Sequence, residues 1–208
     1  MTEPEELDRV VPVVAALCER FAVPVSIDTW RAAVAAACFD VGAVLGNDIS
    51  GFQDPAYLSV AAAAGASVIA THIRLRPRVP DPNPVYDDVV ATVRTVLAEK
   101  ARAAVAAGIP ATGVLVDAGL DLGKTADQSL SLLRASRELA TLGFPLLLSA
   151  SNKRFLGDRL DLPIDARNDA SLAAAALGVA LGCRVLRVHD VKGTVRVRDA
   201  VQSVLEAG

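Results

Sequence analysis

The chain has 208 residues, of which 52% are hydrophobic and 22% charged, and its net charge at pH 7 is −3. This length and mixture are typical of a globular protein with one sizeable core, so we expect a single domain over residues 1–208. The small negative charge, without a basic stripe, argues against a nucleic-acid partner. The longest apolar stretch, 172–182, is about half as long as a membrane span. No signal peptide opens the chain, so we expect a cytoplasmic protein with no membrane partner.

One pattern recurs along the chain after an opening helix over residues 3–21: a short apolar run is followed by an Ala-rich segment with helical spacing. The apolar runs predict strands over residues 23–28, 43–47, 67–72, 113–117, 145–149 and 184–189. The Ala-rich segments predict helices over residues 29–41, 54–65, 85–108, 126–143, 168–182 and 191–207. Such strand-then-helix units give parallel strands joined by right-handed crossovers.

Two architectures have this repeat, a (β/α) barrel and an open doubly wound sheet. A dinucleotide-binding sheet would carry G-x-G-x-x-G after its first strand, and the sequence has no such motif. Barrels build their sites where the strands end, and each predicted strand here ends on a polar residue. These residues are Asp28, Asn47, His72, Asp117, Ser149 and His189. The sequence therefore predicts a TIM-barrel-like (β/α) repeat with six parallel strands, an incomplete barrel.

Several polar residues near the strand ends have simpler interpretations. Asp28 precedes Thr29 and is a candidate helix cap, Asp48 is a candidate helix or turn cap, and His72 is interpreted as structural. Residues 119–125 read G-x-x-x-G-K-T, one residue short of the P-loop spacing, so Lys124 is interpreted as a surface or helix-start lysine. The Pro-rich stretch 74–86 predicts a long loop, either a lid or an inert connection.

Five motifs follow the predicted strands in chain order. They are Ser26-Ile27-Asp28-Thr29, Asn47-Asp48-Ile49-Ser50-Gly51, the stretch 117–125, the stretch 149–157, and Arg187-Val188-His189-Asp190-Val191. In this order they resemble dihydropteroate synthase, the pterin-binding barrel of folate biosynthesis, from about Glu5 to the C-terminus.

The resemblance implies a transferase that joins 6-hydroxymethyl-7,8-dihydropterin diphosphate to 4-aminobenzoate and releases pyrophosphate, with Mg²⁺ as cofactor. Its implied pterin contacts are Asp28, Asn47, Asp117 and Lys153; Arg187 and His189 match the diphosphate ligands, and Ser151 lies beside aminobenzoate. Lys153, Arg187 and His189 are the implied catalytic residues. The chemistry agrees, because the donor edge of a pterin needs carboxylate and amide acceptors and its carbonyl needs a cation. Leaving pyrophosphate needs an arginine and a second donor.

The sequence also departs from the family. The Asn-Val-Thr-Pro-Asp-Ser-Phe and Ser-Thr-Arg-Pro-Gly motifs of the family's first two strand–loop units are missing, and with them its metal-binding Asn. Asp121 replaces a Gly, Leu122 an aromatic residue, Ser149 a Gly, and Arg154 a Ser. We expect the charge of Asp121 to repel a diphosphate and turnover to be slow.

Four interpretations stay open at this point. The chain is a shortened synthase, a paralogue that binds a pterin-like ligand without turnover, a structural or interaction relic of the barrel, or a methyltransferase on the same barrel. The methyltransferase gives no reason for the Lys153 loop or for Arg187 with His189. We therefore expect a synthase with impaired activity. The exposed edge of an incomplete barrel favours pairing with another chain, such as a homodimer.

Overall fold

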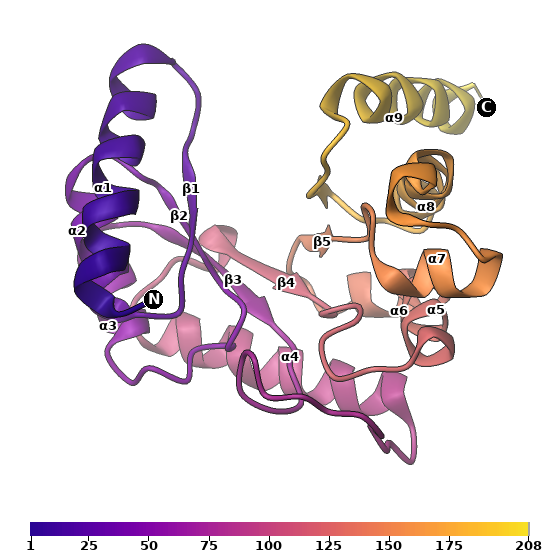
Figure 1. Cartoon of the computed structure of the whole chain (residues 1–208), viewed down its shortest axis with the longest axis horizontal. Coiled ribbons are helices and arrows are strands. Elements are labelled where there is room, and N and C mark those ends of the chain that lie inside the picture. Colours follow the sequence, from indigo (N-terminus) through magenta and orange to yellow (C-terminus); the bar gives the residue numbers. More distant parts are fainter. Residues whose placement is uncertain (208) are drawn as a thin grey trace. The chain divides into compact units, whose positions relative to one another are not determined.

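The computed structural model describes residues 1–207 (Figure 1). The contacts divide the chain into two compact units. Unit one contains Met1–His72 and Leu97–Val116, and unit two contains Ile73–Val96 and the described residues from Asp117 onward. No helix among the described residues is long and apolar enough to cross a membrane.

The elements of unit one are α1 (Glu3–Arg20), β1 (Ser26–Asp28), α2 (Ala32–Asp40), β2 (Leu45–Asp48), α3 (Tyr57–Ala63), β3 (Ser67–Thr71) and the short 3-10 helix η1 (Ala111–Gly113). Those of unit two are α5 (Ala126–Arg134), α6 (Ser136–Ala140), β5 (Leu146–Leu148), α7 (Arg154–Leu160), the 3-10 helix η2 (Ile164–Ala166), α8 (Asn168–Ala180), β6 (Val185–Leu186) and α9 (Val191–Glu206). Two elements cross the division: α4 (Val89–Ala106), and β4 (Val114–Asp117), whose last residue belongs to unit two.

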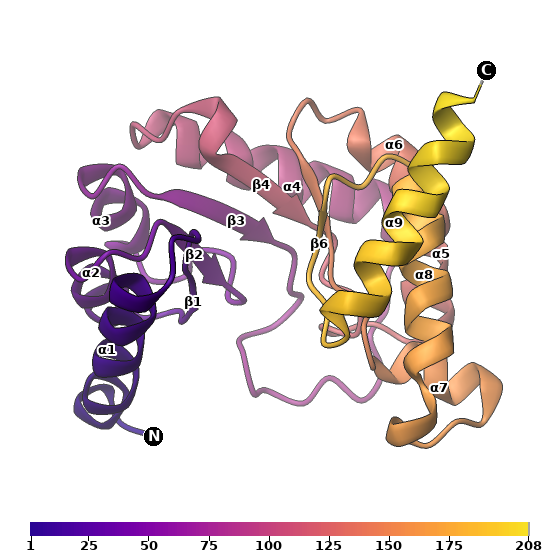
Figure 2. The same ribbon diagram turned by 90° about the horizontal axis from the view of Figure 1, so that it is seen from above.

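In unit one, β1, β2 and β3 form a parallel ladder, and α1, α2 and α3 lie together on one side of it (Figure 2). Between sheet and helices lies a core of small and aromatic side chains, among them Val34, Tyr57 and Val68. The buried carboxylate of Glu6 ties α1 to the chain after β1. It accepts a hydrogen bond from Thr29 Oγ1 at 2.6 Å and pairs with Arg31. The chain after β1 is thereby held against α1.

In unit two, β5 pairs in parallel with β6, with Leu147 opposite Val185 and Leu148 opposite Leu186. Helix α8 packs against both α9 and α7, and α5 packs against α7; α8 and α9 lie side by side (Figure 2). Leucines from α5, α6 and β5 form the core of this unit. The loop between β5 and α7 therefore begins at a densely packed part of the core.

All six predicted strands are present, but they are shorter than predicted. Asp28 and Asp117 end their strands as expected, whereas Asn47 is the last but one residue of β2. The remaining three polar residues, His72, Ser149 and His189, lie beyond the ends of β3, β5 and β6. The polar positions are therefore loop residues as often as strand ends.

The predicted helices are shorter in the structure, two of them most clearly, and one helix was not predicted. The helix expected from residue 85 begins at Val89, because the Asp88 side chain accepts the N–H groups of Val90 and Ala91 at 2.9 and 3.0 Å and acts as a cap. The helix expected over 126–143 is two helices, since Ala135 leaves helical geometry at φ −83° and ψ 9°. Helix α7 lies within the 149–157 motif and its continuation, for which no helix was predicted.

Candidate functional site

Asp28 and Asn47 lie on one rung at the carboxyl end of the unit-one ladder. The register places Asp28 opposite Asn47, with Asp28 exposed and Asn47 buried. Asp48 beside them is fully buried, and its carboxylate accepts the N–H groups of Ser50 at 2.7 Å and Phe52 at 2.8 Å. The prediction of a turn cap is thus confirmed for Asp48. Burial raises the pKa of this carboxyl, against the lowering effects of its bonds to Ser50 and Phe52 and of Lys100.

The interpretation of Asp28 as a helix cap is wrong. Helix α2 begins only at Ala32, and Arg31 in the N-cap position makes no side-chain capping bond. The N–H group of Ala32 donates instead to Asp54 Oδ2, 2.8 Å away and 22 residues further along the chain. Because Asp54 caps α2, helix capping does not explain why β1 ends on Asp28.

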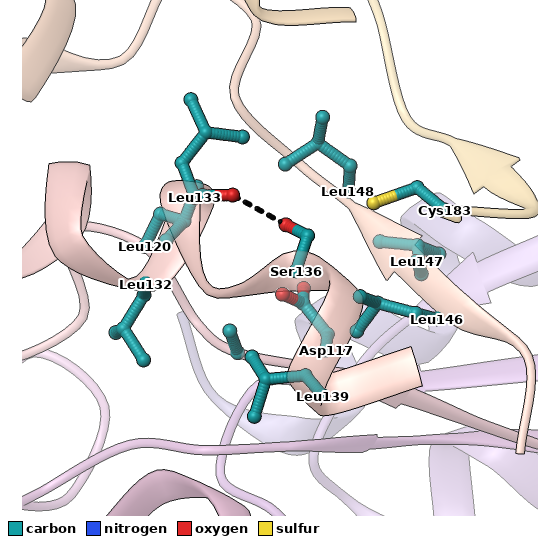
Figure 3. A pocket seen from close by; sticks show the side chains of 11 residues that line it. Asp117, Leu120, Leu132, Leu133, Ser136, Leu139, Leu146, Leu147, Leu148 and Cys183 are labelled. Atoms are coloured by element: carbon teal, nitrogen blue, oxygen red, sulfur yellow. Dashed lines mark hydrogen bonds between the residues drawn. The ribbon is translucent and has the colours of Figure 1, made fainter. Parts of the chain in front are cut away.

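Asp117 ends β4 against an apolar layer. Leucines of α5, α6 and β5 surround it, together with Ser136 and Cys183 (Figure 3). The void among these side chains is about 10 Å³, about enough for one water molecule, so the side of Asp117 that faces these leucines is packing rather than a ligand pocket. Asp117 is 7% exposed, and its Oδ1 accepts the N–H of Gly119 at 2.8 Å. A carboxylate in such surroundings interacts strongly with nearby charges.

One charge that interacts with Asp117 is that of Lys124, which is buried. Its Nζ donates to the carbonyl oxygens of Gly119 at 2.8 Å and Leu122 at 3.0 Å. Burial lowers the pKa of Lys124 to about 7, and Asp117 acts in the opposite direction. The prediction of a surface lysine is therefore wrong, although Lys124 does directly precede Thr125, the N-cap of α5. In the sequence, Lys124 stands at the end of a glycine-containing turn that follows a buried strand. This position is the feature that could have indicated its burial.

Lys153 approaches the same turn from the β5–α7 loop. Its Nζ donates to the carbonyl oxygen of Leu120 at 2.7 Å. Burial lowers the pKa of Lys153, whereas Asp117 and, more weakly, Asp121 raise it. The structure thus brings together the predicted pair Asp117 and Lys153 and adds Lys124, which sequence reasoning had set aside.

Asp121, the residue that replaces a family glycine, is part of this turn. Its backbone has the left-handed φ of +66°, which explains a glycine at this position. The Oδ2 atom accepts the N–H of Phe155 at 3.3 Å, in the first turn of α7. Asp121 also raises the pKa of both Lys124 and Lys153. The extra carboxylate is therefore engaged by a helix start and compensated by two lysines, which weakens the repulsion expected from the sequence.

Ser151 and His189 meet on two loops of unit two. Ser151 Oγ lies 2.8 Å from His189 Nδ1, and the backbone N–H of His189 donates to the same oxygen at 3.2 Å. Arg187 is exposed on the loop after β6 and lowers the pKa of Lys153, so its charge acts on the Lys153 amine. The resemblance assigned Ser151 and His189 to different ligands, yet their side chains share one hydrogen bond.

Two residues that sequence reasoning missed hold the Lys153 loop. Arg167 donates from Nη1 to the carbonyl oxygen of Asn152 at 3.2 Å and from Nε to that of Leu162 at 3.0 Å. Ser171 Oγ accepts the N–H of Asn152 at 2.9 Å. Gly157 makes room for this arrangement, because a Cβ there would overlap the Arg167 guanidinium. Both residues lie outside the recognised motifs, so spacing alone gave no signal for them.

The long loop after β3 is fastened to the Asp117 turn. Arg74 and Asp81 form an ion pair at 2.7 Å that packs on Gly123, whose φ is +63°. Tyr86 donates its hydroxyl to the Gly123 carbonyl oxygen at 2.8 Å, and Gln128 Nε2 donates to that of Pro84 at 3.1 Å. The loop is thus held at both ends. His72, which precedes it, is buried, as its structural interpretation requires.

The family's cofactor, Mg²⁺, would need side chains able to hold a metal ion. Among residues 1–207 no group of three or more His, Cys, Asp or Glu side chains could hold a metal ion. We therefore assign no chemistry to a protein-held Mg²⁺.

The sequence matches the family described as pterin binding enzyme over residues 1–189. It is 41% identical over 216 residues to dihydropteroate synthase of Mycobacterium leprae, covering 100% of this chain and 76% of the relative. It is 42% identical over 209 residues to the inactive dihydropteroate synthase 2 of the same bacterium, and this match covers 96% of this chain and 70% of the relative. An active and an inactive relative are therefore equally similar.

Solved structures agree with the sequence matches. The crystal structure of Yersinia pestis dihydropteroate synthase with a sulfonamide drug superimposes with a TM-score of 0.96 at 38% identity, covering 100% of this chain and 76% of that one. Two Xanthomonas albilineans structures, 35% identical with TM-scores of 0.92 and 0.91, contain 4-aminobenzoic acid and 7,8-dihydropteroate.

The chain belongs to the pterin-binding enzymes and, within them, to the dihydropteroate synthase family. The predicted fold class, a TIM-barrel-like (β/α) repeat with six parallel strands, is confirmed by this structural likeness. The single-domain boundary and the roles of the individual site residues stay predictions.

Proposed function

We propose that the protein is a dihydropteroate synthase-like transferase of folate biosynthesis, with a pterin as its first ligand. The observation that carries this proposal is the buried Asp117 carboxylate with Lys153 acting on it electrostatically. A carboxylate accepts the amine and ring N–H donors of a pterin, and an ammonium donates to its carbonyl oxygen. Asp28 and Asn47, paired on one rung in unit one, supply further acceptors. Their assignment to the pterin follows the family resemblance.

The diphosphate is proposed to bind Arg187 and His189, and 4-aminobenzoate to lie beside Ser151. A guanidinium with a second donor suits the charge that develops on a leaving diphosphate. In this reaction the aminobenzoate nitrogen attacks the pterin methylene carbon and the carbon–oxygen bond to the diphosphate breaks. Pyrophosphate leaves with the bonding electrons, and the new secondary amine loses a proton to solvent. The bond between Ser151 and His189 couples the two proposed subsites.

Calorimetric titration with 6-hydroxymethylpterin tests the first step. Asp117→Asn keeps the shape of the side chain but removes its charge, so the affinity should fall about tenfold to 150-fold, the range of a charge-assisted hydrogen bond. Asp127→Asn is the matched control, because Asp127 is exposed on α5 and its replacement should leave the affinity unchanged. No binding by the unaltered protein, or equal affinities for all three proteins, would refute the pterin assignment.

A second candidate function is pterin binding without turnover. The similarity to an inactive relative favours it, because the inactive dihydropteroate synthase 2 of Mycobacterium leprae is 42% identical to this chain. The protein should then release pyrophosphate very slowly. Each electrostatic contact to the transition state that is absent lowers the rate of the reaction about 10²–10³-fold. A coupled pyrophosphate assay distinguishes the candidates: normal turnover excludes the second, and pterin binding with negligible turnover excludes the first.

A further inference from the structure

A hollow of about 310 Å³ lies beside the turn that follows Asp117, within unit two. One wall is the loop over residues 73–81 and the other is the turn over residues 121–124, with Arg154 of α7 at the edge. A volume of this size is at the lower end of those of small-molecule pockets. Neither the pterin assignment nor the diphosphate assignment uses it.

The charges that line this hollow are mostly positive. Four cationic side chains, Arg76, Arg78, Lys124 and Arg154, face two carboxylates, Asp81 and Asp121. Both carboxylates have partners: Asp81 pairs with Arg74, and Asp121 accepts the N–H of Phe155.

The cations differ in how firmly they are held. Lys124 is more than nine-tenths buried and lines the hollow, and its amine is mostly protonated only below a pH of about 7. The only ion pair of Arg154 within the described residues is with Asp158, at 3.6 Å on the surface, where 81% of the arginine side chain is exposed. Exposed pairs of this kind contribute about 0–1 kcal/mol, so an incoming anion can replace Asp158.

We propose that this hollow, defined by Arg76, Arg78, Lys124 and Arg154, is a binding site for a small dianion. With Lys124 protonated the lining has an excess of two positive charges, which a dianion neutralises. Guanidinium groups bind phosphate and carboxylate oxygens alike through paired N–H donors. The ligand is therefore either a phosphate or a small dicarboxylate. The site is separate from Arg187 and His189, and it does not depend on the proposed synthase function.

The test is calorimetric titration of the whole protein with inorganic phosphate and, separately, with glutarate. The double variant Arg76→Gln with Arg78→Gln should lower the affinity about tenfold or more, and Arg154→Gln should lower it less. Arg187→Ala should leave the affinity at this site unchanged. Arg94→Gln, which removes an exposed arginine on α4 outside the hollow, is the matched control. Circular dichroism of each variant verifies that it is folded.

The two titrants separate the two ligand classes: binding of phosphate alone identifies a phosphate site, and binding of glutarate alone a dicarboxylate site. The proposal is overturned if neither anion binds the unaltered protein at millimolar concentration. It is equally overturned if the double variant and Arg154→Gln both keep full affinity, or if Arg187→Ala abolishes all anion binding. Since Arg154 is largely exposed, its variant remains informative even if the double variant fails to fold.

Discussion

Replacing Lys124 by methionine should change how the stability of the protein depends on pH. Lysine in an unfolded chain has a pKa of 10.5, and burial lowers that of Lys124 to about 7. Between these two values the unfolded chain binds a proton that the folded protein does not. Stability therefore rises as the pH increases from about 7 to 10.5 and is lowest below 7.

The size of the effect follows from the same two values. A pKa difference of about 3.5 corresponds to about 5 kcal/mol of unfolding free energy across this pH range. Methionine has nearly the same length but no charge, so the variant lacks this pH dependence. It also lacks the two hydrogen bonds to Gly119 and Leu122, which together contribute about 2 kcal/mol at any pH. The Lys124→Met variant should consequently be more stable than the unaltered protein at pH 6 and less stable at pH 10.

Urea unfolding followed by circular dichroism at intervals from pH 6 to pH 10 measures this difference. Groups that do not interact with Lys124 titrate equally in the two proteins, so their contributions cancel, whereas Asp117, Asp121 and Lys153 are coupled to its charge. Lys192→Met, at an exposed position on α9, is the control, and its difference from the unaltered protein should not vary with pH. Parallel pH profiles for Lys124→Met and the unaltered protein would show that the Lys124 amine is not buried as described.

Two further predictions concern the loops of unit two. Arg187→Ala should weaken pyrophosphate binding in a salt-dependent way, measured by calorimetry at two ionic strengths; unchanged affinity would remove Arg187 from the proposed diphosphate site. Gly157→Ala should destabilise the protein by about 1–3 kcal/mol, because the new methyl group displaces the Arg167 guanidinium. In an Arg167→Ala background the same change should be nearly neutral in urea unfolding, and an equal loss in both backgrounds would contradict the contact.

The repeat of strands and helices could be predicted from the sequence because it depends on local patterns. Apolar runs and Ala-rich segments recur in order, and each run does contain a strand. Strand ends were less accurate, because pairing decides where a ladder stops. β6 ends at Leu186, and the polar tail to His189 continues as a loop.

The candidate site shows the same limit at the level of single residues. Asp117 and Lys153 belong to motifs, and the structure brings them together. Lys124 belongs to a motif too, but its burial depends on a turn whose carbonyl groups converge on the amine, which no spacing encodes. Arg167 supports Asn152 from 15 residues away, and its role is visible only once α7 is folded between them.

The register of β1 on β2 limits where the chain can change in length. Strand β1 has only three residues, and inserting or deleting one of them would turn Asp28 to the opposite face of the sheet and away from Asn47. Pro82 and Asn83 present the opposite case. They are exposed and lie between the Arg74–Asp81 pair and the Pro84 anchor, so added residues there would extend the loop without moving either anchor. Related chains should therefore tolerate insertions at positions 82–83 and none within β1.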